Sequence, residues 1–135
     1  MNRLGDHLRH ATAALLALFL GTMLTEGLVL LPYWRSLPAD EFFRWYAAND
    51  QRLIGFFGPV TAAMALCALA AAAVSLRARH PQRGSAVTAA ALAIVTVGMF
   101  FVYFEHANAS FAAAPIVPAE LPAELARWAL WHWVR

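Results

Sequence analysis

Three long runs of apolar residues alternate with short polar segments along the chain. The runs cover residues 11–32, 53–76 and 85–104. A helix of about 20 residues spans the roughly 30 Å hydrocarbon core of a bilayer. The pattern therefore predicts three transmembrane helices, which makes the lipid bilayer the first expected partner of the chain.

Two further segments have the shorter, amphipathic pattern of helices that lie at a membrane surface. Residues 38–50 begin with a proline and two acids, which favour a helix N-terminus, and continue with aromatic side chains. Residues 122–134 repeat apolar side chains at helical spacing. All five tryptophans and all three tyrosines lie at or beyond the same ends of the spans. We therefore expect an all-α transmembrane bundle with two interfacial helices on its outer side.

The composition indicates a single integral membrane domain and excludes several other classes. Of the 135 residues, 61% are hydrophobic and only 13% are charged, whereas a soluble domain has about 25% charged residues. The ten basic residues are scattered and are offset by eight acids, so no nucleic-acid partner is expected. Cys67 is the only cysteine, which excludes a disulfide within the chain.

Arginine is denser at one set of span ends than at the other. Arg3 and Arg9 precede the first span, and Arg77, Arg79 and Arg83 lie in the hairpin between the second and third spans. The other side carries as many arginines, but over a longer stretch that also contains six acids. Arginine enrichment is typical of cytoplasmic flanks. We expect a multi-pass protein of the inner membrane with a cytoplasmic N-terminus.

Polar side chains within the spans mark a candidate site. Glu26 lies inside the first span, and Thr22 lies one turn before it. An ionisable group at this depth costs at least about 2.5 kcal/mol unless it faces protein or water. In the third span, Tyr103 and His106 continue a stripe of hydroxyl-bearing residues at helical spacing. If the two polar strips face each other, Glu26, Tyr103 and His106 converge near the outer boundary.

The segment 122–134 is then expected to cover this site with His132 and Arg127. Three interpretations of Glu26 remain open. It can transfer a proton or bind a ligand, or it can pair with an arginine or a tyrosine and fix the helices. It can also belong to a metal site with other acids and imidazoles, for which no HExxH spacing provides support. The candidate metal ligands are Glu26, Glu105, His106 and His132.

The order of several short motifs resembles the anthrone-oxygenase-like family of small membrane proteins. The first span ends in LLPYWRSLP, Pro59 lies early in the second span, and the third span leads to Asn108 and Phe111. The chain closes with RWALWHWVR, which is the most specific part of the resemblance. The residues of this tail that match the family are Arg127, Trp128, His132 and Arg135.

The resemblance implies a four-helix bundle. For some members it also implies the oxidation of anthrones by molecular oxygen, without a metal or an organic cofactor. The family continues into a fourth span, whereas this sequence stops at Arg135. The expectation is therefore a truncated chain, or a homo-oligomer or partner membrane subunit that supplies the missing helix.

Two classes of function follow. In the first, the protein is an enzyme that oxidises an apolar aromatic substrate with oxygen, and its catalytic groups are Glu26, His106 and His132. Substrate contacts are then expected from Thr22, Tyr103, Asn108, Arg127, Trp128 and Arg135. In the second, the protein is a non-catalytic accessory subunit or binds lipid or another hydrophobic ligand. Transport is disfavoured because residues 13–19, the cytoplasmic half of the first span, are wholly apolar.

Overall fold

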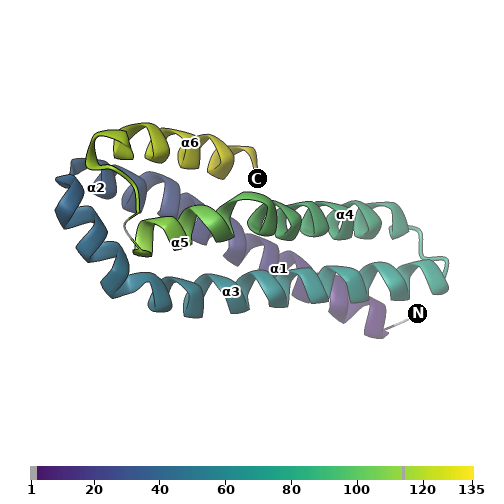
Figure 1. The fold of residues 1–135 in the computed structure, drawn as a ribbon. Coiled ribbons are helices and arrows are strands. Elements are labelled where there is room, and N and C mark those ends of the chain that lie inside the picture. Colours follow the sequence, from purple (N-terminus) through teal and green to yellow (C-terminus); the bar gives the residue numbers. More distant parts are fainter. Residues whose placement is uncertain (1–2, 114) are drawn as a thin grey trace.

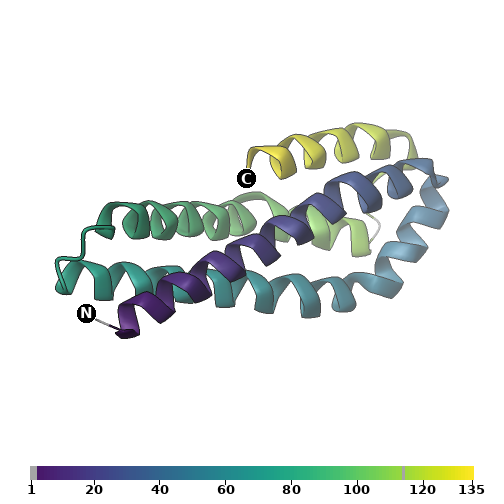
Figure 2. The ribbon, with the colours of Figure 1, turned by 180° about the vertical axis from the view of Figure 1, so that it is seen from behind.

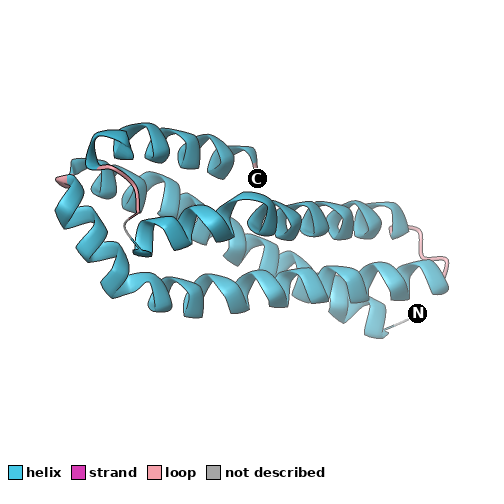
Figure 3. Cartoon of the chain, in the orientation of Figure 1, coloured by secondary structure: helices cyan, strands magenta, loops and turns pink. Residues whose placement is uncertain are grey.

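The computed structural model describes residues 3–113 and 115–135, and helices joined by short loops make up this part of the chain (Figures 1 and 3). Two of the elements are π-helices and one is a 3₁₀-helix; the others are α-helices. In chain order the elements are α1 (Arg3–Thr25), η1 (π, Glu26–Leu30), α2 (Leu31–Ser36), α3 (Ala39–Arg77), α4 (Arg83–Met99), η2 (π, Phe100–Phe104), α5 (Glu105–Ala113), η3 (3₁₀, Pro118–Glu120) and α6 (Leu121–Val134).

Within residues 3–113 and 115–135, three continuous helices are long and apolar enough to cross a membrane, which confirms the predicted all-α bundle with three spans. They cover Gly5–Ser36, Ala39–Arg77 and Arg83–Ala113. The first contains α1, η1 and α2, and the third contains α4, η2 and α5. Both pack against α3, which α1 crosses obliquely (Figures 1 and 2).

The expected interfacial helix over residues 38–50 is not a separate element. It is the first part of α3, which runs for 39 residues without a break. Pro38 precedes the helix, and Asp40 and Glu41 occupy its first turn, as the sequence predicts. The following polar residues, Asn49 to Arg52, include no proline or glycine that would end a helix, so the segment continues directly into the second span.

The predicted helix over residues 122–134 is present as α6, but it does not lie across the end of the bundle. It turns back along the bundle beside η1 and α2 (Figures 1 and 2). Its inward face follows helical spacing, with Leu121, Leu125, Trp128 and His132 buried. Packing this face against other helices buries more of it than a position at the membrane surface would.

The π-helix η1 has a local cause. Pro32, near the start of α2, has no backbone N–H and its ring collides with the carbonyl one turn earlier in a regular α-helix. Neighbouring π-type hydrogen bonds accommodate such a proline in membrane helices. The N–H of Leu31 accordingly donates to the carbonyl of Glu26, five residues earlier. This adjustment lies where the first span meets α6.

Two buried cores of different character hold the bundle together. The aromatic core joins α2, the first part of α3, η2, α5 and α6, and the alanine core joins α3 and α4. The aromatic core consists of Leu31, Trp34, Phe42, Phe43, Tyr46, Phe104, Phe111, Leu121, Leu125, Trp128 and Ala129. The alanine core consists of Met64, Ala65, Ala68, Ala72, Ala86, Ala90 and Ala93.

Candidate functional site

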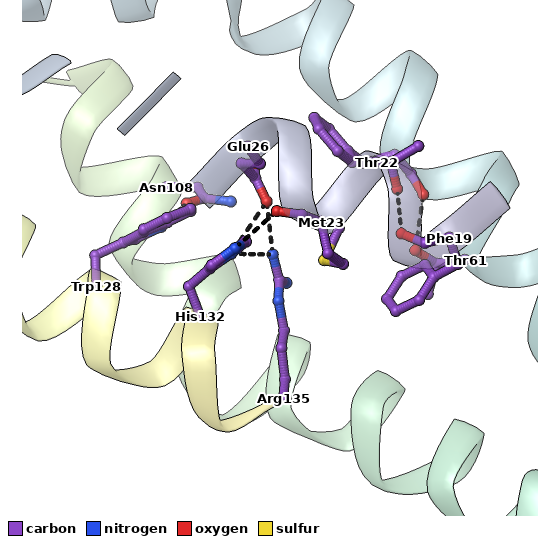
Figure 4. A network of polar contacts seen from close by, with 10 residues as sticks. Phe19, Thr22, Met23, Glu26, Thr61, Asn108, Trp128, His132 and Arg135 are labelled. Carbon is purple, nitrogen blue, oxygen red and sulfur yellow. Dashed lines mark hydrogen bonds and ion pairs between the residues drawn. The ribbon is translucent and has the colours of Figure 1, made fainter. Parts of the chain in front are cut away.

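Glu26 is buried at the junction of η1 and α6, with 6% of its surface exposed. Nη2 of Arg135 donates a hydrogen bond of 2.8 Å to Oε2 of Glu26. Nδ1 of His132 lies 3.3 Å from the same oxygen (Figure 4). We call Glu26, His132 and Arg135 the ionic cluster. It ties the first span to the last helix of the described chain.

The contact of His132 with the backbone of α1 requires a proton on one of its ring nitrogens. Nε2 lies 3.0 Å from the carbonyl oxygen of Met23, and only an N–H can donate to that acceptor. Nδ1 lies between two charged groups, 3.3 Å from Oε2 of Glu26 and 3.2 Å from Nη2 of Arg135. Both ring nitrogens are therefore in polar contact, and the ring also stacks on Trp128 at a centroid distance of 5.0 Å. His132 is therefore held rigidly on three sides.

Gly27 allows α6 to approach this closely. A Cβ atom at position 27 would lie 2.6 Å from Cζ2 of Trp133 and 2.9 Å from Nε2 of His132. Both distances are well inside van der Waals contact, so any larger residue would displace α6 or the imidazole. Glu26 therefore provides the carboxylate, and the next residue, Gly27, leaves the space that α6 needs to reach it.

Arg135 completes the cluster against an aromatic ring. Its guanidinium carbon lies 3.9 Å from the centroid of Phe104, which is the geometry of a cation–π contact. Its Nε atom is buried and has no hydrogen-bond partner in the described part of the chain. Burial lowers the pKa of Arg135, and the neighbouring Glu26 opposes this shift. Arginine is not deprotonated in proteins, so the guanidinium is charged.

A cavity of about 600 Å³ lies between the three long helices and reaches the ionic cluster. Its polar end is formed by Glu26, Tyr46, Asn108, Trp128 and Arg135. Its walls are mainly apolar, with further polar residues at Asp50, Gln51, Thr61, Thr96 and Glu105. The apolar lining includes Phe19, Met23, Leu53, Ile54, Phe57, Gly58, Val97, Phe100 and Phe101. Such a site suits a mainly apolar molecule with a polar group at one end.

One carboxylate oxygen of Glu26 has no hydrogen-bond donor among the described residues. Both of its cluster contacts use Oε2, and no other described residue donates a hydrogen bond to Oε1. Glu26 is nevertheless part of the cavity lining. Oε1 is therefore the free acceptor at the polar end, beside the charged guanidinium of Arg135.

Several of the predicted site residues meet at this place. Glu26 and His132 belong to the ionic cluster, and Arg135, expected as a substrate contact, pairs with Glu26 directly. Trp128 lines the cavity and donates from Nε1 to Oδ1 of Asn108 at 3.0 Å. The interpretation in which Glu26 pairs with an arginine is therefore realised.

The predicted convergence of Glu26 with His106 is wrong, because His106 is exposed. The third span turns its alanines inward and continues this face with Phe104, Asn108 and Phe111. At about 100° per residue, position 106 then points away from the cluster. Close helix packing by small and aromatic side chains decides the inward face. His106 of the polar stripe is therefore exposed, whereas Thr96 of the same stripe lines the cavity.

Three other expected site residues also lie apart from the ionic cluster. The ring of Tyr103 stacks on Trp131 at 4.9 Å. Arg127 is exposed and bonds Glu124 on its own helix. The hydroxyl of Thr22 donates to the carbonyl of Phe19, also on its own helix, at 2.7 Å (Figure 4). A hydroxyl satisfied in this way needs no partner on another helix.

The structure adds participants that the sequence analysis does not name. Tyr46 lines the cavity, Phe104 packs under Arg135, and Gly27 admits α6. The spacing of three residues between His132 and Arg135 places both on one helix face and could have indicated a joint role. Within residues 3–113 and 115–135, no three His, Cys, Asp or Glu side chains are grouped so that they could hold a metal ion.

Comparisons with family models, with curated proteins and with solved structures find no match to this chain.

Proposed function

We propose that this multi-pass membrane protein binds an apolar small molecule between its helices. The observation that carries the proposal is the cavity of about 600 Å³, whose apolar walls end at the buried carboxylate of Glu26 and the guanidinium of Arg135. Ligand sites of this size and character hold molecules of a few fused rings. Oε1 of Glu26 accepts a hydrogen bond from a ligand hydroxyl, and Arg135 favours a neighbouring carbonyl or other electron-rich oxygen.

Two glycines on α3 provide a matched test of this proposal. Gly58 lines the cavity, whereas Gly55 does not, and an added Cβ meets nothing within 4 Å at either position. The probe is 1,8-dihydroxyanthrone, added to the protein in lipid nanodiscs, and binding is followed by quenching of tryptophan fluorescence. Gly58→Leu fills the cavity and abolishes saturable quenching, and Gly55→Leu leaves it unchanged. Unaltered quenching in Gly58→Leu would overturn the proposal.

A second candidate function, oxidation of the bound molecule by oxygen, is favoured by the free Oε1 of Glu26. A carboxylate that is fixed through one oxygen and free at the other is oriented to accept a proton from an acidic CH₂ group. The overall reaction converts CH₂ and O₂ to C=O and water, so one oxygen atom enters the substrate and the other leaves as water. This is the reaction that the family resemblance implies.

Oxygen consumption separates the two candidates. An enzyme consumes oxygen with 1,8-dihydroxyanthrone in proportion to protein concentration, and Glu26→Gln removes this activity while binding persists. Glu41→Gln, which changes an exposed acid in the first turn of α3, is the control. A binding protein saturates with the ligand and shows no consumption above the rate of the ligand alone.

We also propose that the N-terminus and the α3–α4 hairpin face the cytoplasm across the inner membrane. The hairpin carries Arg77, Arg79 and Arg83, all exposed. In a Cys67→Ser background, single cysteines are placed by Ala78→Cys and Ser36→Cys. A membrane-impermeant maleimide applied to intact cells labels position 36 and spares position 78. The opposite pattern would reverse the orientation.

A further inference from the structure

A second hollow lies on the outside of the bundle, between α1 and α3. It is a groove of about 660 Å³ and is mainly apolar. From α1 and η1 it is lined by Ala17, Leu18, Gly21, Thr22, Thr25 and Leu30. From α3 it is lined by Trp45, Asn49, Arg52, Leu53, Phe56 and Phe57. We call it the α1–α3 groove.

The groove is separate from the cavity that reaches Glu26. Leu53 and Phe57 line both spaces, so their side chains form the wall between them. The floor of the groove is open at Gly21, where an added Cβ would meet nothing within 4 Å. The groove therefore has room for an extended chain along the helices.

One charged side chain lines the groove. Arg52 lines it, and no aspartate or glutamate does. Arg44, Arg127 and Arg135 each have a carboxylate partner, whereas Arg52 forms no ion pair among the described residues. The groove thus carries one positive charge that no acidic side chain neutralises.

The position of Arg52 along α3 indicates the depth of this charge in the membrane. The next charged residue on α3 is Arg77, so Arg52 stands directly at the start of the apolar stretch 53–76. Trp45 lies two turns before it, and tryptophan is enriched at the level of lipid headgroups. The charge therefore lies at the headgroup boundary. The part of the groove beyond it, at Leu53, Phe56 and Phe57, extends toward the hydrocarbon core.

We propose that the α1–α3 groove binds one anionic phospholipid. The phosphate contacts the guanidinium of Arg52, and one acyl chain lies along Gly21, Leu18 and Phe56. An anionic headgroup is favoured over a zwitterionic one because the groove contains a cation and no carboxylate. This site is independent of the proposed ligand cavity.

The test compares lipids that remain bound to the protein. The chain is incorporated into nanodiscs of equal amounts of palmitoyl-oleoyl phosphatidylglycerol and phosphatidylcholine, released into mild detergent, and weighed by native mass spectrometry. The wild type retains phosphatidylglycerol in preference to phosphatidylcholine. Arg52→Gln lowers the phosphatidylglycerol occupancy about fivefold, the effect expected of one arginine near a headgroup.

Two pairs of variants make the result specific to the groove. Arg35→Gln removes another exposed arginine that forms no ion pair among the described residues and lies outside the groove, and it leaves the occupancy unchanged. Gly21→Leu fills the groove and removes the bound lipid, whereas Gly55→Leu, outside the groove, does not. Equal losses in Arg52→Gln and Arg35→Gln would overturn the proposal in favour of diffuse attraction. A shift from dimer to monomer in Gly21→Leu, with lipid unchanged, would assign the groove to a second copy.

Discussion

The two cores of the bundle differ in the size of the side chains they bury. In the alanine core, six of the seven residues are alanine and Met64 is the exception. The aromatic core buries Trp34, Phe42, Phe104, Phe111 and Trp128 almost completely. Small residues allow membrane helices to approach closely, whereas large rings hold them apart. None of the alanine-core residues lines the cavity, while Tyr46 and Trp128 of the aromatic core do.

The cores also differ in how buried polar groups are satisfied. At the alanine end of the bundle, Thr12 bonds the carbonyl of Leu8 on its own helix, and Ser75 has no hydrogen-bond partner among the described residues. At the aromatic end, Glu26 bonds Arg135, which is 109 positions away. Polar contacts between distant elements are therefore concentrated where the cavity meets them. At the other end the thiol of Cys67 lies 3.8 Å from the carbonyl oxygen of Leu8, and close packing dominates the contacts among the described residues.

The largest expected effect follows from removing the cation of the ionic cluster. Arg135→Met leaves the buried carboxylate of Glu26 without its charged partner, and breaking a buried ion pair in this way costs about 3–5 kcal/mol. We expect the free energy of unfolding in detergent to fall by this amount, with a matching fall in Tm by circular dichroism.

The control for this prediction is Arg127→Met. Arg127 pairs with Glu124 on the exposed side of α6, so its loss changes stability by no more than about 1 kcal/mol. The double variant Glu26→Gln/Arg135→Met removes both charges and recovers part of the loss. Equal effects of Arg135→Met and Arg127→Met would show that the ionic cluster does not fasten α6.

A somewhat smaller loss is expected from Gly27→Ala. The added Cβ meets Nε2 of His132 at 2.9 Å, and the imidazole cannot yield without losing its bond to the carbonyl of Met23. Overpacking of this kind costs about 1–3 kcal/mol. The measurement is again Tm, with Gly21→Ala as the control because nothing lies within 4 Å of a Cβ there. If Gly27→Ala and Gly21→Ala have the same Tm, α6 does not pack closely against Gly27.

The corresponding change in the alanine core is Ala68→Leu. Ala68 is fully buried among residues of α3 and α4, so a larger side chain pushes these helices apart. The expected loss is also about 1–3 kcal/mol. Ala63→Leu changes an exposed alanine on the same helix and leaves Tm unchanged. Stability equal to the control would mean that the helices at this end are not in close contact.

The fold could be predicted from the sequence because its main determinant is local. The apolar runs and their length specify three membrane helices, and the spacing of Leu121, Leu125 and Trp128 specifies the buried face of α6. Glu26 stood out because a carboxylate within an apolar run needs a partner. These features require no knowledge of which helix faces which.

The partner of Glu26 could not be chosen from the sequence for the same reason. From the sequence, His106 and His132 are equally plausible partners for Glu26. The choice between them depends on the packing of α4 through Ala86, Ala90 and Ala93. Nor does the pattern of residues 121–134 specify whether the amphipathic helix covers the end of the bundle or folds back along it. Contacts between distant elements decide both points.

The smallest predicted effect is a gain in stability from Ser75→Ala. It tests whether buried polar groups at the alanine end lack partners. Ser75 is 1% exposed, and its hydroxyl forms no hydrogen bond within the described part of the chain. A buried hydroxyl without a partner costs about 1–3 kcal/mol, so Ser75→Ala should raise stability, by about 1 kcal/mol once the loss of packing is included. Ser110→Ala removes an exposed hydroxyl bonded to the carbonyl of His106 and should leave Tm nearly unchanged. A lower Tm for Ser75→Ala would show that the hydroxyl does have a partner, and the alanine end would then depend on polar contacts as the aromatic end does.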